Sequence, residues 1–203
     1  MAAPQAPLLI VEDIPDTLKL LDATLKFKGY RVVTAVNGHE ALEAIKKERP
    51  ALVITDILMP KMDGFNLVHR LRINPETRNI PVIFLSATYV APEDKAFATS
   101  IGATRFIEKP IDLDSFLQTV ADLLKRGVTA PLPPLQEHDF YVGYRDRLQT
   151  KLDHKVAQIA RIERLLETVS DEEKDDFRAS LAQAVSERDE IQNLLAQIRE
   201  YLE

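Results

Sequence analysis

Residues 52–64 read LVITDILMPKMDG, and this stretch joins a buried strand to a polar strand end. Leu52, Val53 and Ile54 are apolar in succession, which is typical of a strand that is covered on both faces. The strand ends at Asp56, and Gly64 opens an amphipathic segment after a short loop. This order of strand, polar loop and helix predicts one unit of an alternating α/β fold.

The same unit recurs on both sides of this stretch. The expected strands are residues 7–12, 31–36, 51–57, 81–87 and 105–108, and the expected helices are residues 15–28, 39–48, 64–73, 93–100 and 113–125. Five strands alternating with five helices predict a doubly wound, five-stranded parallel sheet with helices on both faces. We therefore expect an α/β domain over residues 1–126.

The composition is that of a globular protein, with 45% hydrophobic and 29% charged residues among 203. The chain has no cysteine, which excludes disulfides and thiolate metal sites. No apolar run approaches the roughly 18 residues of a membrane span, and the run at residues 8–11 is too short for a signal peptide. We expect a cytoplasmic protein with no membrane partner. The net charge of −6 argues against nucleic acid as a partner.

Polar side chains of complementary kinds stand at the ends of four expected strands. Glu12 and Asp13 end the first strand, Asp56 ends the third, Ser86 lies near the end of the fourth, and Lys109 ends the fifth. The carboxyl ends of parallel strands meet at one edge of a sheet, so these groups should converge there. Three carboxylates repel one another and need a cation, and hard oxygen ligands favour Mg²⁺.

This edge of the sheet has the parts for phosphoryl transfer. A carboxylate can attack phosphorus to form an acyl phosphate, while the ammonium of Lys109 and the hydroxyl of Ser86 can bind phosphoryl oxygens. Each acid alone is more often a solvated residue or a helix cap, and Asp13 could cap a helix that begins at Pro15. Phe106 could likewise be an ordinary core residue. Five suitable residues at four strand ends favour the functional interpretation.

Four motifs in order carry a family resemblance: Val11-Glu12-Asp13, the stretch 56–64, Leu85-Ser86-Ala87, and the stretch 102–110. Residues 7–126 resemble a response-regulator receiver domain with a flavodoxin-like fold. The resemblance implies that Asp56 accepts a phosphoryl group from a sensor histidine kinase or a phosphotransfer protein. The implied chemistry is a stoichiometric switch with self-catalysed phosphorylation and slow hydrolysis, and not turnover as an enzyme.

The resemblance also implies a ligand set for Mg²⁺. Asp13, Asp56 and the carbonyl of Leu58 would bind the ion directly, and Glu12 would act through water. Glu12 stands where many members have aspartate. Leu58 and Thr88 flank the expected phosphoryl position, and the side chain of Leu58 cannot hydrogen-bond an attacking water. We expect a long-lived phosphorylated state for that reason.

A switching mechanism is implied by the same resemblance. Lys109 would pair with the phosphoryl group, Ser86 would swing towards it, and Phe106 would follow inward. Pro110 would follow a cis peptide bond. The charge of the phosphoryl group would shift the equilibrium between two packings of one face of the domain. We therefore expect residues 88–108 to present a changed surface to a downstream protein.

The chain changes character after residue 126. Residues 127–137 contain several prolines and predict an extended linker. Residues 138–203 predict an antiparallel helical hairpin or coiled coil, with Ser170 and Glu173 as a capping box at the second helix. Its apolar positions are Leu148, Leu152, Ile159, Ile162, Leu166 and Val169 in the first helix, and Phe177, Leu181, Ala184, Ile191, Leu195, Ile198 and Leu202 in the second.

The apolar stripe of the hairpin is broader than one seam, which favours a homodimeric four-helix bundle formed by residues 138–203. Lys155 and Arg188 interrupt the stripe and either fix its register or reach the solvent. His154 is exposed in this pattern but matches no phosphotransfer motif, and His69 is predicted to be an ordinary surface or loop residue.

Three functions remain open from the residues alone. The first is a switch whose hairpin dimerises or docks on another protein. The second is a phosphorelay intermediate that passes the group onward, with His154 as a candidate carrier. The third is a transcriptional regulator with an unrecognised DNA-binding output, against which residues 138–203 carry 10 Lys and Arg but 15 Asp and Glu.

Overall fold

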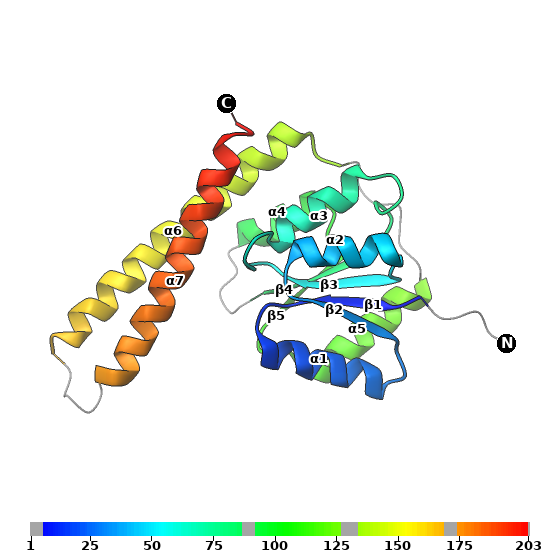
Figure 1. Cartoon of the computed structure of the whole chain (residues 1–203), viewed down its shortest axis with the longest axis horizontal. Coiled ribbons are helices and arrows are strands. Elements are labelled where there is room, and N and C mark those ends of the chain that lie inside the picture. The colour runs from blue at the N-terminus through cyan, green and yellow to red at the C-terminus, as the bar shows by residue number, and fades with distance from the viewer. Residues whose placement is uncertain (1–5, 87–91, 127–133, 169–173, 203) are drawn as a thin grey trace. The chain divides into compact units, whose positions relative to one another are not determined.

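The protein divides into two compact units, Met1–Leu135 and Gln136–Glu203. The computed structural model in Figure 1 describes residues 6–86, 92–126, 134–168 and 174–202. Most of the expected linker, residues 127–133, lies outside the described residues, as do Thr88, Ser170 and Glu173. The described helices include none that is both long and apolar enough to cross a membrane.

The first unit alternates strands and helices along its whole length. Its strands are β1 (Leu8–Val11), β2 (Val32–Ala35), β3 (Leu52–Asp56), β4 (Val82–Ser86) and β5 (Arg105–Glu108), and its helices are α1 (Pro15–Phe27), α2 (Gly38–Lys47), α3 (Gly64–Ile73), α4 (Pro92–Ser100) and α5 (Leu113–Arg126). The strands pair in parallel in the order β2-β1-β3-β4-β5. The predicted fold class is confirmed, and the element bounds differ from the predicted ones by one residue at most.

Helices cover both faces of this sheet, with α1 and α5 on one face and α2, α3 and α4 on the other (Figure 1). On the first face, Leu21 of α1 and Phe116 of α5 pack in one core with Ile10, Ile54 and Leu85 of the strands. Residues of β1, β3 and β4 are buried in succession, because neighbouring side chains point to opposite faces and both faces are covered.

Helices α2, α3 and α5 start at polar caps, and at α5 the side chain of Asp112 accepts the amide of Ser115. The side chain of Asn37 accepts the amide of Glu40 at the start of α2, and that of Asp63 accepts the amide of Asn66 at the start of α3. Helix α1 follows Ile14 instead, with no side-chain cap, so Asp13 is not a helix cap. His69 of α3 is only 3% exposed, and its predicted place on the surface is wrong, because α3 turns this face inward.

The second unit is a pair of long helices, α6 (Glu137–Leu166) and α7 (Lys174–Arg199), which lie side by side (Figure 1). Ile159, Ile162 and Ala184 form one buried apolar cluster of the hairpin, and Leu148, Ile191 and Ile198 are buried as well. The ammonium of Lys155 lies 2.5 Å from a carboxylate oxygen of Glu187 on the other helix. This ion pair joins the two helices in one register, so the register role considered for Lys155 is the one that the geometry favours.

One end of the hairpin is closed by aromatic residues. Tyr141 of α6 stacks on Tyr201, with ring centroids 4.3 Å apart. Phe140 lies 5.5 Å from Tyr144 between ring centroids, in a stacked arrangement. The sequence pattern does not single out this cluster, because its members fall outside the series of apolar positions that defines the seam.

Candidate functional site

The ends of β1, β3, β4 and β5 lie at one edge of the sheet and carry the residues singled out in the sequence. The register pairs Val11 with Thr55 and Asp56 with Leu85, so Asp56 lies one residue before the level of Ser86. Ser86 in turn pairs with Glu108, and the amide of Lys109 donates to the carbonyl of Ser86 over 2.7 Å. The parallel register therefore fixes the relative heights of these side chains.

Three carboxylates meet at this edge. Glu12, Asp13 and Asp56 each offer an oxygen, and these three oxygens lie within 4.8 Å of one another. Glu12 is completely buried, and Asp56 is 9% exposed. Carboxylate oxygens are the hard ligands that Mg²⁺ prefers. The residues present therefore fit the ion.

Lys109 lies between two of these carboxylates. Its ammonium is 2.7 Å from Oε2 of Glu12 and 2.8 Å from Oδ2 of Asp56. The other oxygen of Glu12 accepts the amide of Ile14, and Oδ1 of Asp56 accepts the amide of Ile57 over 2.6 Å. One cation and two amides thus hold the two acids in fixed orientations.

The electrostatics of the site reflect burial and crowding. Burial, reinforced by the charge of Asp56, raises the pKa of Glu12 in spite of its ion pair with Lys109. Burial is also the main cause that raises the pKa of Asp13. Burial alone would lower the pKa of Lys109, but the charges and hydrogen bonds of Asp56 and Glu12 outweigh it and raise that pKa. The site therefore holds more negative charge than one lysine can balance.

The loop after Asp56 is held by close backbone contacts. The amide of Gly64 donates to the carbonyl of Ile57, and a Cβ at Gly64 would lie 2.2 Å from the carbonyl oxygen of Asp56. The amide of Gly38 at the start of α2 donates to the carbonyl of Met62. These approaches explain why glycines stand there. Leu58 of the same loop is 39% exposed.

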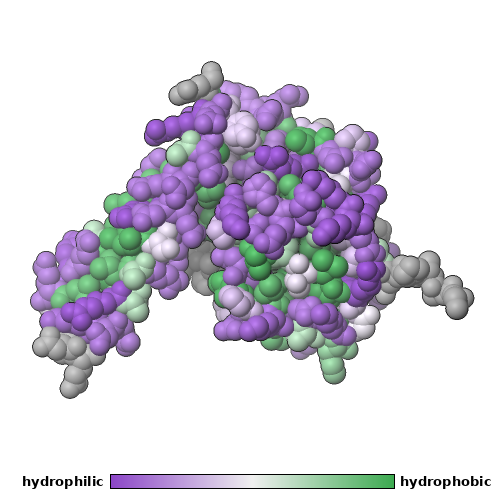
Figure 2. All heavy atoms as spheres, viewed as in Figure 1, coloured by the Kyte–Doolittle hydropathy of each residue, from purple (hydrophilic) through white to green (hydrophobic). Residues whose placement is uncertain are grey.

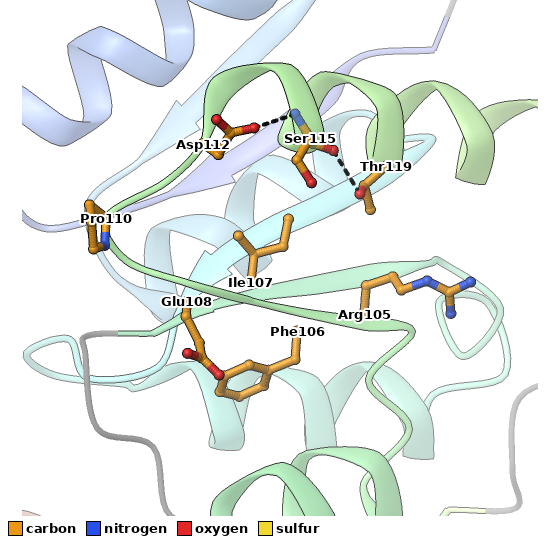
Figure 3. Close-up of a pocket in the computed structure, with 8 residues that line it drawn as sticks. All are labelled: Arg105, Phe106, Ile107, Glu108, Pro110, Asp112, Ser115 and Thr119. Atoms are coloured by element: carbon orange, nitrogen blue, oxygen red, sulfur yellow. Dashed lines mark hydrogen bonds between the residues drawn. The ribbon is translucent and has the colours of Figure 1, made fainter.

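The residues expected to switch lie next to this cluster. Ser86 is buried, and the ring of Phe106 is 6.5 Å from that of Phe84 between centroids. The peptide bond between Lys109 and Pro110 is cis. Phe106 also lines a hollow of about 360 Å³ over β5 and the start of α5. Figure 3 shows Phe106 and Glu108 on one side of β5, with Ile107 pointing to the opposite side, towards α5.

Two contacts of this region are not predicted from the sequence. Lys95 of α4 forms an ion pair with Glu108 and lies over the ring of Phe106, 5.9 Å from its centroid. The buried guanidinium of Arg72 in α3 donates to the carbonyl of Gly102 over 2.7 and 3.1 Å, and burial lowers the pKa of Arg72 to about 10. Lys95 is the fourth residue of α4, and the sequence around it does not indicate which residues of β5 it contacts.

The geometry at the strand ends agrees with the comparisons to known proteins. The model of the response regulator receiver domain matches residues 8–121. The chain belongs to this family. The crystal structure of the chemotaxis response regulator CheY4 of Vibrio cholerae superposes with a TM-score of 0.55 at 32% identity, covering 59% of this chain and 99% of that one. The family and fold expected for residues 7–126 are thus confirmed.

Two relatives of this receiver protein are considerably longer chains. The transcriptional regulatory protein GlrR of Escherichia coli is 39% identical over 131 residues, which are 64% of this chain and 29% of GlrR. A protein of Vibrio cholerae named "probable cyclic di-GMP phosphodiesterase" is 31% identical over 159 residues, 78% of this chain and 34% of that protein. The chain spans about a third or less of the length of these two relatives.

Few described residues of the hairpin of this receiver protein carry a side chain suited to phosphotransfer or catalysis. His154 is exposed on α6. Arg188 pairs with its neighbour Asp189, and its side chain is partly exposed. Val156 is 48% exposed and Leu165 is 36% exposed. Figure 2 shows hydrophobic residues along the hairpin among hydrophilic ones, so part of its apolar stripe remains uncovered.

Proposed function

We propose that Asp56 accepts a phosphoryl group from a sensor histidine kinase or a phosphotransfer protein in a Mg²⁺-dependent reaction. The observation that carries this proposal is the cluster of Glu12, Asp13 and Asp56 with Lys109 against two of its members. A carboxylate held beside a cation is suited to attack phosphorus, and it becomes an acyl phosphate in doing so.

Each neighbour of Asp56 has a part in this proposal. Asp13, Asp56 and the carbonyl of Leu58 would hold the Mg²⁺ ion directly, and Glu12 would hold it through water. The ion supplies positive charge for the phosphoryl oxygens and for the crowded carboxylates. Lys109 then pairs with the bound phosphoryl group, which its present position 2.8 Å from Asp56 supports.

Labelling by a small phosphodonor tests this function. The protein is incubated with acetyl phosphate and Mg²⁺, and its intact mass is measured. We expect one added phosphoryl group, and none with EDTA or in Asp56→Asn. Asp16→Asn is the matched control, because Asp16 is a solvent-exposed acid on α1, and it should be labelled like the wild type. Equal labelling of Asp56→Asn would refute the assignment.

The output, in this proposal, is a protein contact whose surface depends on Phe106. Ser86 moves towards the phosphoryl group, Phe106 moves into the space that it leaves, and the hollow lined by Phe106 changes shape. Residues 88–108 thereby present a different surface to a downstream protein, although 88–91 lie outside the described residues. The switch would act in the cytoplasm.

The hairpin forms a homodimer in this proposal. Val156 and Leu165 leave apolar surface uncovered, and a second hairpin could bury it in a four-helix bundle. The alignment to the Vibrio cholerae phosphodiesterase relative includes 159 residues of this chain, so it must reach into α6. That likeness supports a role for α6 in carrying the signal beyond the receiver.

Light scattering with and without Mg²⁺ and beryllofluoride, a mimic of the phosphoryl group, tests the dimer. A dimer in both states would make the hairpin a constitutive platform, and a dimer with the mimic alone would make dimerisation the output. Val156→Glu should give a monomer, whereas the exposed neighbour Ala157→Glu should not. A monomeric wild type in both states would refute the bundle.

A further inference from the structure

Lys95 of α4 contacts two residues of β5 whose side chains lie on the same side of the strand. Alternate residues of a strand point to the same face, and Phe106 and Glu108 share one (Figure 3). Lys95 pairs with the carboxylate of Glu108 and places its ammonium over the ring of Phe106, 5.9 Å from the ring centroid. We refer to Lys95, Glu108 and Phe106 as the clasp.

The clasp adjoins the phospho-acceptor edge through Glu108. Glu108 pairs in the sheet with Ser86 and directly precedes Lys109. Phe106 and Glu108 both line the hollow of about 360 Å³. The ring of Phe106 also lies 6.5 Å from that of Phe84 between centroids, and Phe84 is fully buried whereas the side chain of Lys95 is exposed. A movement of Phe106 towards the core would therefore separate it from Lys95.

We propose that Lys95 is a positioning residue that sets the equilibrium of the switch by holding Phe106 in its unphosphorylated position through the clasp. This inference rests on the proposed function, because it takes Phe106 to move when Asp56 is phosphorylated. A contact that exists in one of two states favours that state by its own free energy. Loss of the contact must then favour the phosphorylated arrangement and the ligands that bind it.

The strength of the contact fixes the size of the expected effect. The side chain of Lys95 is 48% exposed, so its ion pair with Glu108 is screened and weak. Loss of one exposed cation–π contact corresponds to a shift of about two- to fivefold in an equilibrium constant. Lys95→Met should therefore bind beryllofluoride with a midpoint about two- to fivefold lower than that of the wild type.

The test is a beryllofluoride titration in Mg²⁺, followed by NMR of phenylalanine-labelled protein so that the ring signals of Phe106 report its position. Lys95→Arg keeps a cation over the ring and should restore the wild-type midpoint and the wild-type ring signals. Lys46→Met is the matched control, because Lys46 is an exposed lysine that pairs with Glu43 of its own helix; its midpoint should be unchanged. Glu108→Gln, which removes the anchor of Lys95, should lower the midpoint in the same direction and serves if Lys95→Met does not fold.

Two results would overturn the clasp while leaving the proposed function intact. One is that the wild type binds beryllofluoride and that the midpoint of the Lys95→Met titration equals that of the wild type. The other is a Lys95→Arg variant as shifted as Lys95→Met, which would mean that the cation is not what matters. A wild type that fails to bind beryllofluoride at all would instead refute the proposed function, and the clasp with it.

Discussion

Replacement of Lys109 by methionine should show how strongly the stability of the acidic cluster depends on the positive charge of this lysine. The variant keeps most of the volume of the side chain and removes the ammonium that lies 2.7 Å from Glu12 and 2.8 Å from Asp56. Glu12 is completely buried, so its carboxylate cannot recover solvation from water. Two crowded carboxylates would then remain without their protein cation.

The magnitude depends on the burial of the partners. Removal of one partner of a buried ion pair costs roughly 3 to 5 kcal/mol. The side chain of Lys109 is 19% exposed, so we expect the lower end, a loss of about 3 kcal/mol in the free energy of unfolding without metal. Mg²⁺ should stabilise both proteins, by about 2.7 kcal/mol at 100 times the dissociation constant, and it should stabilise the variant more, because the ion binds more tightly where the charge of Lys109 no longer repels it.

The assay is urea unfolding at neutral pH in EDTA and again in saturating Mg²⁺. Lys109→Met should unfold at markedly lower urea than the wild type in EDTA, and Mg²⁺ should narrow the difference. Lys46→Met, which removes an exposed ion pair, should match the wild type in both buffers. If Lys109→Met is as stable as the wild type in EDTA, the cluster does not depend on that cation and our electrostatic reasoning fails.

Three further variants probe other parts of the site. Leu58→Asn should shorten the lifetime of the phosphorylated state several-fold, measured by loss of the added mass, because an amide can orient the attacking water; an unchanged lifetime removes the basis for that role. Gly64→Ala should lower the free energy of unfolding by about 3 kcal/mol, since its Cβ would lie 2.2 Å from the carbonyl oxygen of Asp56; near-wild-type urea unfolding would contradict the contact. Asp13→Asn should stabilise the metal-free protein at neutral pH. Because folding raises the pKa of Asp13, the ionised side chain opposes folding above that raised value, and the advantage of the variant should shrink as pH falls towards the ordinary value of 3.8. A constant advantage down to pH 4 would show another cause.

The fold of the receiver was predictable because its strands are covered on both faces. Leu8 to Val11 and Leu52 to Ile54 have no polar member, and that pattern occurs where helices lie above and below a parallel sheet. The parallel order then brings Asp13, Asp56 and Lys109 together, since residues at the carboxyl ends of neighbouring strands must share an edge. Local pattern and simple topology were sufficient here.

Contacts between elements that are distant in sequence were not predictable in the same way. Lys95 reaches Glu108 across a helix–strand junction, and Arg72 reaches Gly102 over thirty residues. Their partners depend on the angle at which each helix crosses the sheet, which apolar periodicity does not specify. The same reason explains His69, whose polar side chain indicated a surface position although the packing of α3 buries it.

The hairpin shows where a pattern defines helices but leaves their use open. The apolar series predicted two long helices, and Lys155 interrupted it without revealing that Glu187 of the second helix is its partner. The series could not show which apolar residues remain exposed on one chain. Val156 belongs to the broader apolar stripe of the sequence, and the structure adds that it is exposed.

The central claim is that Asp56 itself carries the phosphoryl group, and chemical mapping tests it most directly. Protein labelled with acetyl phosphate and Mg²⁺ is treated with borohydride, which reduces an acyl phosphate of aspartate to homoserine, and its peptides are sequenced by mass spectrometry. Our account predicts homoserine at position 56 and at no other acidic residue of the cluster. Homoserine at position 13 with Asp56 intact, or no conversion in fully labelled protein, would contradict it.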